Sequence, residues 1–241
     1  MELLGTIRGI TRYPFKSMAG EALPAAAIGW HGLDGDRRFA FRRVGDTSGF
    51  PWLSASRVPA LLCHRPYYPP GGESGQVVRV VAPDGEDLAG DSAELRDRIA
   101  ASCGGGVELV HLKHGIQDEA PLSLITVATI RRLSEASGVP FDVRRFRPNI
   151  LVETQDEQPF TEDRWVGRRL SIGGRAESAL VGVTMRDLRC AMVNLDPDTA
   201  RSDPRLLKAT ATLNMVFAGV YGVPLLGGTA RVGDGIFALP A

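Results

Sequence analysis

Cysteine and histidine are scarce in this chain. Its 241 residues include three cysteines, Cys63, Cys103 and Cys190, and four histidines. An odd, scattered set of cysteines argues against a disulfide framework and indicates a reducing compartment. Three thiols are also too few for an iron–sulfur cluster, which normally needs four. His111 and His114 have no carboxylate or cysteine spaced with them as a zinc site requires, so we expect surface or strand residues there.

An excess of one charge and a long apolar run are also missing. The 28 Lys and Arg residues balance 28 Asp and Glu residues. A balanced chain has no global attraction to nucleic acid or to an anionic membrane, so an anion site must be a local gathering of basic side chains. The most apolar stretch, residues 215–226, is interrupted by glycine and proline and is too short to span a bilayer. The N-terminus has no signal-peptide pattern, so we expect a cytoplasmic protein without nucleic-acid or membrane partners.

Glycine and proline, in contrast, are plentiful and widely spread, with 28 and 16 residues respectively. Short apolar runs between such residues are typical of many short strands. We read residues 67–75 as a loop. The expected strands cover residues 3–13, 37–43, 76–82, 107–112, 149–153, 169–172, 179–185, 214–221, 229–232 and 236–238.

Three helices are expected among these strands. Asp91 and Glu94 have the spacing of a capping box, which predicts a helix that starts at Asp91 and ends at the triple glycine 104–106. A second helix is expected over residues 126–137, and a third starts at Asp203, directly before a proline. The polar stretch 113–120 predicts a boundary between two domains, residues 1–115 and residues 116–241.

Cys190 is the cysteine whose neighbouring residues best suit a metal-binding thiolate. A thiolate is the form of cysteine that binds soft metals. Arg186 and Arg189 would favour this charged form. The alternative is a small buried hydrophobe, the common state of a free cysteine, which we expect for Cys63 and Cys103.

Two clusters of polar and basic side chains could bind an anion. Lys16 offers a charge on a flexible stem, and Ser17 offers a hydroxyl and a backbone N–H. Arg37 and Arg147 carry planar guanidinium groups that can hold a phosphate with two hydrogen bonds. Arg145 lies in the same segment as Arg147. Together with the thiol, these clusters suggest a metal cofactor that also carries an anionic group.

Each of these assignments has a structural alternative. Lys16 could be a solvated charge at the end of a strand, and Arg37 could form an ion pair with Asp34 or Asp36. Pro148 is expected to push Arg147 into an extended conformation.

The segment Asp196-Pro197-Asp198-Thr199 follows the thiol. Asp196 and Asp198 could move protons near a metal. The same four residues are also a good turn sequence, which is the alternative.

The chain resembles the MOSC-domain proteins in their two-part form. Any one of the matching motifs is short, but they occur in the family's order and span nearly the whole chain. They are Tyr-Pro-Phe-Lys-Ser at 13–17, Gly-Leu-Asp-Gly-Asp-Arg-Arg-Phe at 32–39, Arg-Phe-Arg-Pro-Asn-Ile at 145–150, Glu-Asp-Arg-Trp-Val-Gly at 162–167, Arg-Cys at 189–190 and Asp-Pro-Asp-Thr at 196–199.

The resemblance implies an α+β, β-rich fold. A MOSC β-barrel with a few flanking helices would pack on a smaller N-terminal mixed β domain. It also implies a molybdenum cofactor (molybdopterin) between the two parts, with Cys190 as catalytic residue and metal ligand. Lys16, Ser17, Arg37, Arg145, Arg147 and Asn149 would then bind the pterin or its phosphate. No pyridoxal-phosphate domain and no iron–sulfur cluster are expected in this chain.

The same resemblance favours an oxidoreductase similar to the mitochondrial amidoxime-reducing component. Such an enzyme reduces small N-hydroxylated substrates with electrons from a separate donor protein. This chain departs from those relatives at Glu119 and Ala120, where they have small hydroxyl residues, and at Phe39, where tryptophan is usual. Two alternatives are a non-catalytic carrier of the cofactor or of sulfur on Cys190, and a thiol hydrolase that pairs Cys190 with a histidine.

Overall fold

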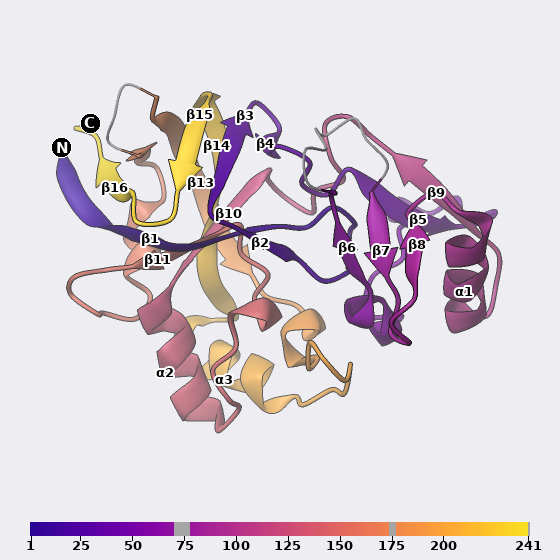
Figure 1. The fold of residues 1–241 in the computed structure, drawn as a ribbon. Coiled ribbons are helices and arrows are strands. Elements are labelled where there is room, and N and C mark those ends of the chain that lie inside the picture. Colours follow the sequence, from indigo (N-terminus) through magenta and orange to yellow (C-terminus); the bar gives the residue numbers. More distant parts are fainter. Residues whose placement is uncertain (70–77, 174–176, 241) are drawn as a thin grey trace.

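A computed structural model describes residues 1–69, 78–173 and 177–240 (Figure 1). Seven strands form a barrel in the order β11-β10-β14-β13-β12-β16-β1, and pairing of β1 with β11 closes it. This confirms the expected α+β, β-rich fold. The seven are β1 (Glu2–Arg12), β10 (Leu122–Thr126), β11 (Ile150–Glu153), β12 (Arg169–Ile172), β13 (Ala179–Leu188), β14 (Phe217–Leu226) and β16 (Gly235–Ala238).

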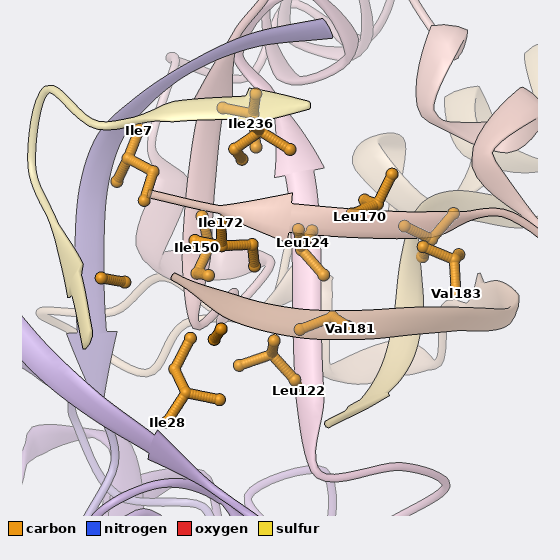
Figure 2. Close-up of a cluster of buried hydrophobic side chains, with 14 of the residues drawn as sticks. Ile7, Ile28, Leu122, Leu124, Ile150, Leu170, Ile172, Val181, Val183 and Ile236 are labelled. Carbon is orange, nitrogen blue, oxygen red and sulfur yellow. The ribbon is translucent and has the colours of Figure 1, made fainter. Parts of the chain in front are cut away.

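The barrel interior is an aliphatic core. Ile7 and Ile10 from β1 are each 1% exposed and belong to this cluster. Figure 2 shows Ile7 with branched residues from the other strands. Trp165 is 2% exposed and joins the same cluster. Burying each such side chain stabilises the fold by about 1.5–3 kcal/mol. The first strand of the chain is therefore part of a barrel whose other strands all come after residue 121.

Two helices cover one end of the barrel (Figure 1). Helix α2 (Val127–Ser137) starts directly after β10, with the Thr126 side chain accepting a hydrogen bond from the Thr129 N–H. It ends at Gly138, whose left-handed conformation (φ 66°) suits glycine. Helix α3 (Arg205–Asn214) packs against α2.

A second unit with its own core lies beside the barrel (Figure 1). It contains β5 (Phe39–Arg43) paired with β9 (Val107–His111), and a three-stranded sheet of β6 (Arg65–Tyr67), β7 (Arg79–Val81) and β8 (Asp87–Ala89). Helix α1 (Ala93–Cys103) belongs to the same unit. The remaining short strands are β2 (Glu21–Leu23), which extends the sheet at β1, and β3 (Ala25–Gly29), β4 (Gly32–Leu33) and β15 (Gly228–Arg231), which form a separate sheet.

The predicted start of α1 is wrong by one residue. Ser92, not Asp91, caps the helix, and its hydroxyl accepts a hydrogen bond from the Leu95 N–H at 3.2 Å. Glu94 pairs with Arg98 one helical turn away instead of closing a capping box. Ser92 is the N-cap because the hydroxyl of its short side chain reaches a free N–H of the first turn.

Other boundaries differ by a few residues. Strand β13 continues to Leu188, three residues beyond the expected end. Of the strand expected over 76–82, residues 76 and 77 lie outside the described residues, as do residues 70–75 of the expected loop. In the described part of the chain, helices are too short or too polar to cross a membrane. The boundary between residues 115 and 116 stays a prediction.

Candidate functional site

A cavity of about 300 Å³ lies where the two units meet. Residues far apart in the sequence line it, from the segment after β1, the segment before β11 and the end of β13. Six of the nine residues predicted for the site are on its wall. They are Lys16, Ser17, Arg37, Arg145, Arg147 and Cys190.

Three of these six have a left-handed backbone. The φ angles are 68° at Ser17, 49° at Arg37 and 51° at Arg147. Such a conformation costs a non-glycine residue about 1–2 kcal/mol, and strain of this kind gathers at functional sites. The extended conformation expected for Arg147 before Pro148 is therefore wrong. Tertiary contacts of the Arg147 side chain and carbonyl outweigh the local preference.

Lys16 joins the two units across the cavity. Its side chain is 5% exposed, and its Nζ lies 2.5 Å from Asp118 Oδ1. Burial lowers the pKa of Lys16, and the charge of Asp118 counteracts part of that effect. A solvated charge at a strand end, the alternative considered for Lys16, is therefore excluded.

Arg37 and Arg147 both contact the ring of Tyr13. Their guanidinium carbons lie 4.8 Å and 4.3 Å from the ring centroid. Arg37 also forms an ion pair with buried Asp36, as its structural alternative predicted. The anchored Arg37 therefore has less capacity left for a ligand than Arg147.

Arg147 is one of three arginines of the wall with a buried donor that lacks a hydrogen-bond partner among the described residues; the others are Arg145 and Arg189. Arg147 Nη1 donates a hydrogen bond to the Met18 carbonyl at 2.5 Å. Its Nη2 is buried, and among the described residues it has no hydrogen-bond partner. Burial lowers the pKa of Arg147 to about 10. A buried, unpaired guanidinium nitrogen is costly, which indicates a site shaped for an anion that the protein does not supply.

The structure uses Arg145 and Asn149 mainly for internal contacts. Arg145 donates to the Asn194 carbonyl at 3.1 Å and pairs with Asp196 at 3.0 Å. Asn149 Oδ1 accepts hydrogen bonds from Ser123, and its Nδ2 donates to the Thr11 carbonyl. Arg145 still reaches the cavity, whereas Asn149 is buried and does not line it.

Asp196 and Asp198 also lie off the cavity wall. Asp196 Oδ1 accepts hydrogen bonds from the backbone N–H groups of Asp198 and Thr199, so the segment forms the turn considered as the alternative. Asp198 binds Arg144 through two hydrogen bonds of 2.7 Å. These bonds to Arg144 hold the pKa of Asp198 below its usual value. An ionised, paired carboxylate is a poor proton donor, so the structure does not favour the predicted catalytic roles.

Cys190 lies two residues after the end of β13 and is exposed. Its exposure on the cavity wall excludes the buried hydrophobe considered above. Arg186 and Arg189 are three residues apart, and strand alternation places side chains at such a spacing on opposite faces. Arg189 is held near the cavity by the carbonyls of Phe146 and Ala218, each at 2.7 Å. Arg186 instead stacks on Phe217. The action of both arginines on the thiol stays a prediction.

Several cavity residues were missed by sequence reasoning. Asp118 lies 102 residues from its partner Lys16, and no local signal links the two. Asp187 is 2% exposed and lies 2.8 Å from Arg189. Burial raises the pKa of Asp187 to about 6. Strand alternation could have placed Asp187 and Arg189 on one face, had the strand been extended past 185.

The side chains on the wall fit a phosphorylated cofactor with a soft metal. The wall carries five basic and three acidic side chains, and three basic nitrogens, Arg145 Nε, Arg147 Nη2 and Arg189 Nη2, have no hydrogen-bond partner among the described residues. No histidine is among the described residues of this wall, so the thiol hydrolase arrangement is not formed there. Across the described residues, no three His, Cys, Asp or Glu side chains gather to hold a metal. A metal at Cys190 would therefore take its other ligands from a cofactor.

Two known protein families match this chain. The family described as "MOSC domain" matches residues 111–237, and the family "MOSC N-terminal beta barrel domain" matches residues 4–112. No curated protein matches the chain.

Among solved structures, the YuaD protein from Bacillus subtilis is similar over 96% of this chain and 93% of its own, with 13% identity and a TM-score of 0.51. At that identity the likeness concerns the fold alone. YiiM from Geobacillus stearothermophilus matches half of this chain and 55% of its own, with 20% identity and a TM-score of 0.39. YiiM from Escherichia coli has 15% identity over 51% of this chain and 55% of its own, with a TM-score of 0.36.

Proposed function

The chain belongs to the MOSC domain family, a family that binds molybdenum cofactor, and we propose that it is a molybdenum-cofactor-dependent reductase of N-hydroxylated compounds. The observation that carries this proposal is the shared wall of Arg147 and Cys190. It supplies, in one cavity, an exposed thiol for a metal and a buried guanidinium nitrogen for a phosphate, and no described residue pairs with that nitrogen.

The protein residues would hold and orient the cofactor. Arg147 and Lys16 would bind its phosphate, and Ser17 would add a hydroxyl and an N–H. The Cys190 thiolate would be the one metal ligand from the chain. When bound, the cofactor supplies the two-electron chemistry.

Reduction of an N–OH group also consumes two protons. The N–O bond breaks, an N–H bond forms, and water leaves. Asp187 faces the cavity, and burial raises its pKa to about 6. It can therefore hold a proton on its carboxyl closer to neutral pH than an ordinary aspartate. The electrons would come from a separate donor protein, and a cytoplasmic location remains part of the proposal.

The reaction can be tested with benzamidoxime and chemically reduced viologen. Protein from a host that makes molybdenum cofactor should form benzamidine. The Cys190→Ala variant should lose that activity, whereas Cys63→Ala should keep it because Cys63 does not line the cavity. Cofactor-loaded wild-type protein that reduces no N-hydroxylated compound would contradict the proposal.

The exposure of Cys190 also supports a carrier role as second candidate. An exposed thiol can pass a bound sulfur or cofactor to another protein. Incubation of loaded protein with an apo-molybdoenzyme separates the two ideas. Rapid reactivation of the apo-enzyme favours a carrier, and retention of the metal favours a reductase.

A further inference from the structure

A second cavity, of about 220 Å³, is lined by residues from both halves of the chain. Cys63 comes from the N-terminal half, and Arg144 and Asp198 come from the C-terminal half. We call it the Cys63 cavity, and we call the site described above the Cys190 cavity. Arg147 lines both. A ligand in the Cys63 cavity would therefore contact both halves of the chain and lie next to the proposed cofactor site.

The Cys63 thiol gives this cavity an uncharged surface. Its Sγ donates to the Asp198 carbonyl at 3.5 Å, and a thiol is a weak donor. Burial and the charges of Asp198 and Asp196 raise the pKa of Cys63, so the thiol stays protonated at neutral pH. A protonated thiol behaves as a small, polarizable apolar group. It can therefore pack against the apolar part of a ligand.

The charges around the cavity leave an excess of positive charge. Arg65, Arg144 and Arg147 line it with Asp198 as the acidic residue among its described side chains. Arg144 is paired with Asp198 and with Asp142, which lies off the wall. Even with Asp142 counted, three positive charges face two negative ones. The wall therefore attracts an anion.

Arg65 and Arg147 supply this excess charge. The guanidinium of Arg65 is exposed, and it forms no ion pair or hydrogen bond with another described residue. Arg147 donates to the Met18 carbonyl, and no described carboxylate lies within ion-pair distance of it. A guanidinium binds a carboxylate or a phosphate with two parallel hydrogen bonds. Both side chains thus remain available to an anionic group.

Apolar side chains form the rest of the wall. Leu62 and Tyr13 are buried, and Ala19 and Val143 are half-buried. Ligand pockets typically combine such an apolar lining with a few polar groups that fix the orientation of the ligand. An inorganic ion would leave the apolar side chains uncovered, whereas an anion with an apolar body would remove them from water.

We propose that the Cys63 cavity is a second ligand site, which binds a small organic anion with an apolar body, such as an aromatic or branched carboxylate, through Arg65 and Arg147. This ligand is neither the cofactor nor the substrate of the proposed function. The site is built from residues of both halves of the chain, so it forms only when the two halves are in place.

Three small probes and the three cysteines test the inference in the purified full-length chain. Benzoate has the charge and the ring, benzamide has the same shape without the charge, and acetate has the charge without the ring. Each is titrated to about 20 mM at constant ionic strength, a range suited to ligands of this size. Alkylation by iodoacetamide is then followed for each cysteine by peptide mass spectrometry.

We expect saturating benzoate to slow the alkylation of Cys63 at least about threefold, because the ligand covers the thiol and its charge disfavours the thiolate. Cys103 is the internal control, because it lies on α1 and does not line the cavity. Cys190 reports on binding in the other cavity. Benzamide and acetate should each protect Cys63 with at least about threefold weaker affinity than benzoate.

A pair of arginine variants locates the anionic group. Arg65→Gln should weaken benzoate binding at least about threefold through the lost charge. Arg96→Gln is the matched control, because Arg96 is also exposed, forms no ion pair with another described residue and does not line the cavity. Both side chains are exposed, so neither change removes a buried contact.

Equal protection of Cys63 by benzamide and benzoate would overturn the inference, as would equal losses in the two arginine variants. Protection of Cys190 or Cys103 without protection of Cys63 would also overturn it. The titration needs neither molybdenum nor turnover. Its failure therefore leaves the proposed function standing, and a chain without molybdenum that still binds benzoate at Cys63 would count against the proposed function alone.

Discussion

At the scale of single residues, the proposed anion site depends most on Arg147. Its Nη2 is buried and has no partner in the part of the chain that the structure describes, and burial lowers the pKa of its guanidinium to about 10. A ligand that binds the folded state alone stabilises it by mass action. We therefore expect inorganic phosphate to raise the melting temperature of cofactor-free protein by roughly 2–4 °C, measured at constant ionic strength.

Two variants show whether this stabilisation comes from the cavity. Arg147→Met should abolish the phosphate effect. Arg144→Met is the matched control, because Arg144 is exposed and binds Asp142 and Asp198 outside the cavity. A phosphate effect of equal size in both variants would show that phosphate binds elsewhere.

Asp187 provides a prediction about pH. Its carboxyl has a raised pKa of about 6 in the folded state, so between about pH 4 and pH 6 the folded protein holds a proton that the unfolded chain releases. The stability that this proton provides is complete below about pH 4 and is lost as pH rises through about 6. We expect the free energy of unfolding of the wild type, minus that of Asp187→Asn, to fall by up to about 3 kcal/mol from pH 4 to pH 7. Urea unfolding at several pH values measures it, and a constant difference would contradict the raised pKa.

At the scale of elements, the end of α1 can be tested with two neighbouring glycines. Gly104 has a φ of 70° and caps the helix, whereas Gly105 does not have a positive φ. An added Cβ would meet no atom of the described residues within 4 Å at either position. Gly104→Ala should thus lower the free energy of unfolding by about 1 kcal/mol through backbone strain alone, and Gly105→Ala should change it little. Equal losses in chemical denaturation would disagree with this helix end.

The same scale shows what sequence patterns can and cannot predict. Helix α2 was predictable because Thr126 and Gly138 mark its ends with residues that suit those conformations. Strand β10 was missed because it runs directly into α2, and all five of its residues are buried, so it has no alternation. Strands β2 and β4 have three and two residues and depend on their partners in the sheet.

At the scale of the molecule, β1 is the N-terminal strand that completes the barrel formed by the C-terminal half of the chain. It pairs with β11 and β16, and it buries Ile7 and Ile10 in the barrel. We expect a fragment of residues 116–241 to stay partly unfolded, because the missing strand leaves two unpaired edges and an exposed core. A synthetic peptide of residues 1–20 should restore folding, measured by NMR dispersion. Cooperative folding of the fragment alone would contradict the role of β1.

The candidate site could be predicted in part, because some of its residues lie in recognisable short motifs. Motif residues such as Lys16, Arg147 and Cys190 were found because each has a recognisable local context, and the structure brings them to one wall. The ion pair of Lys16 with Asp118 and the turn that removes Asp198 from the wall depend on contacts between distant segments. Short sequence patterns carry no information about such contacts.

The central claim is that the cavity between the two halves holds a molybdenum cofactor through Arg147 and Cys190. Elemental analysis of protein from a cofactor-producing host tests it most directly. We predict near-stoichiometric molybdenum in the wild type and in Arg144→Met, and a large loss in Arg147→Met. Wild-type protein without molybdenum, or equal contents in the two arginine variants, would contradict the claim.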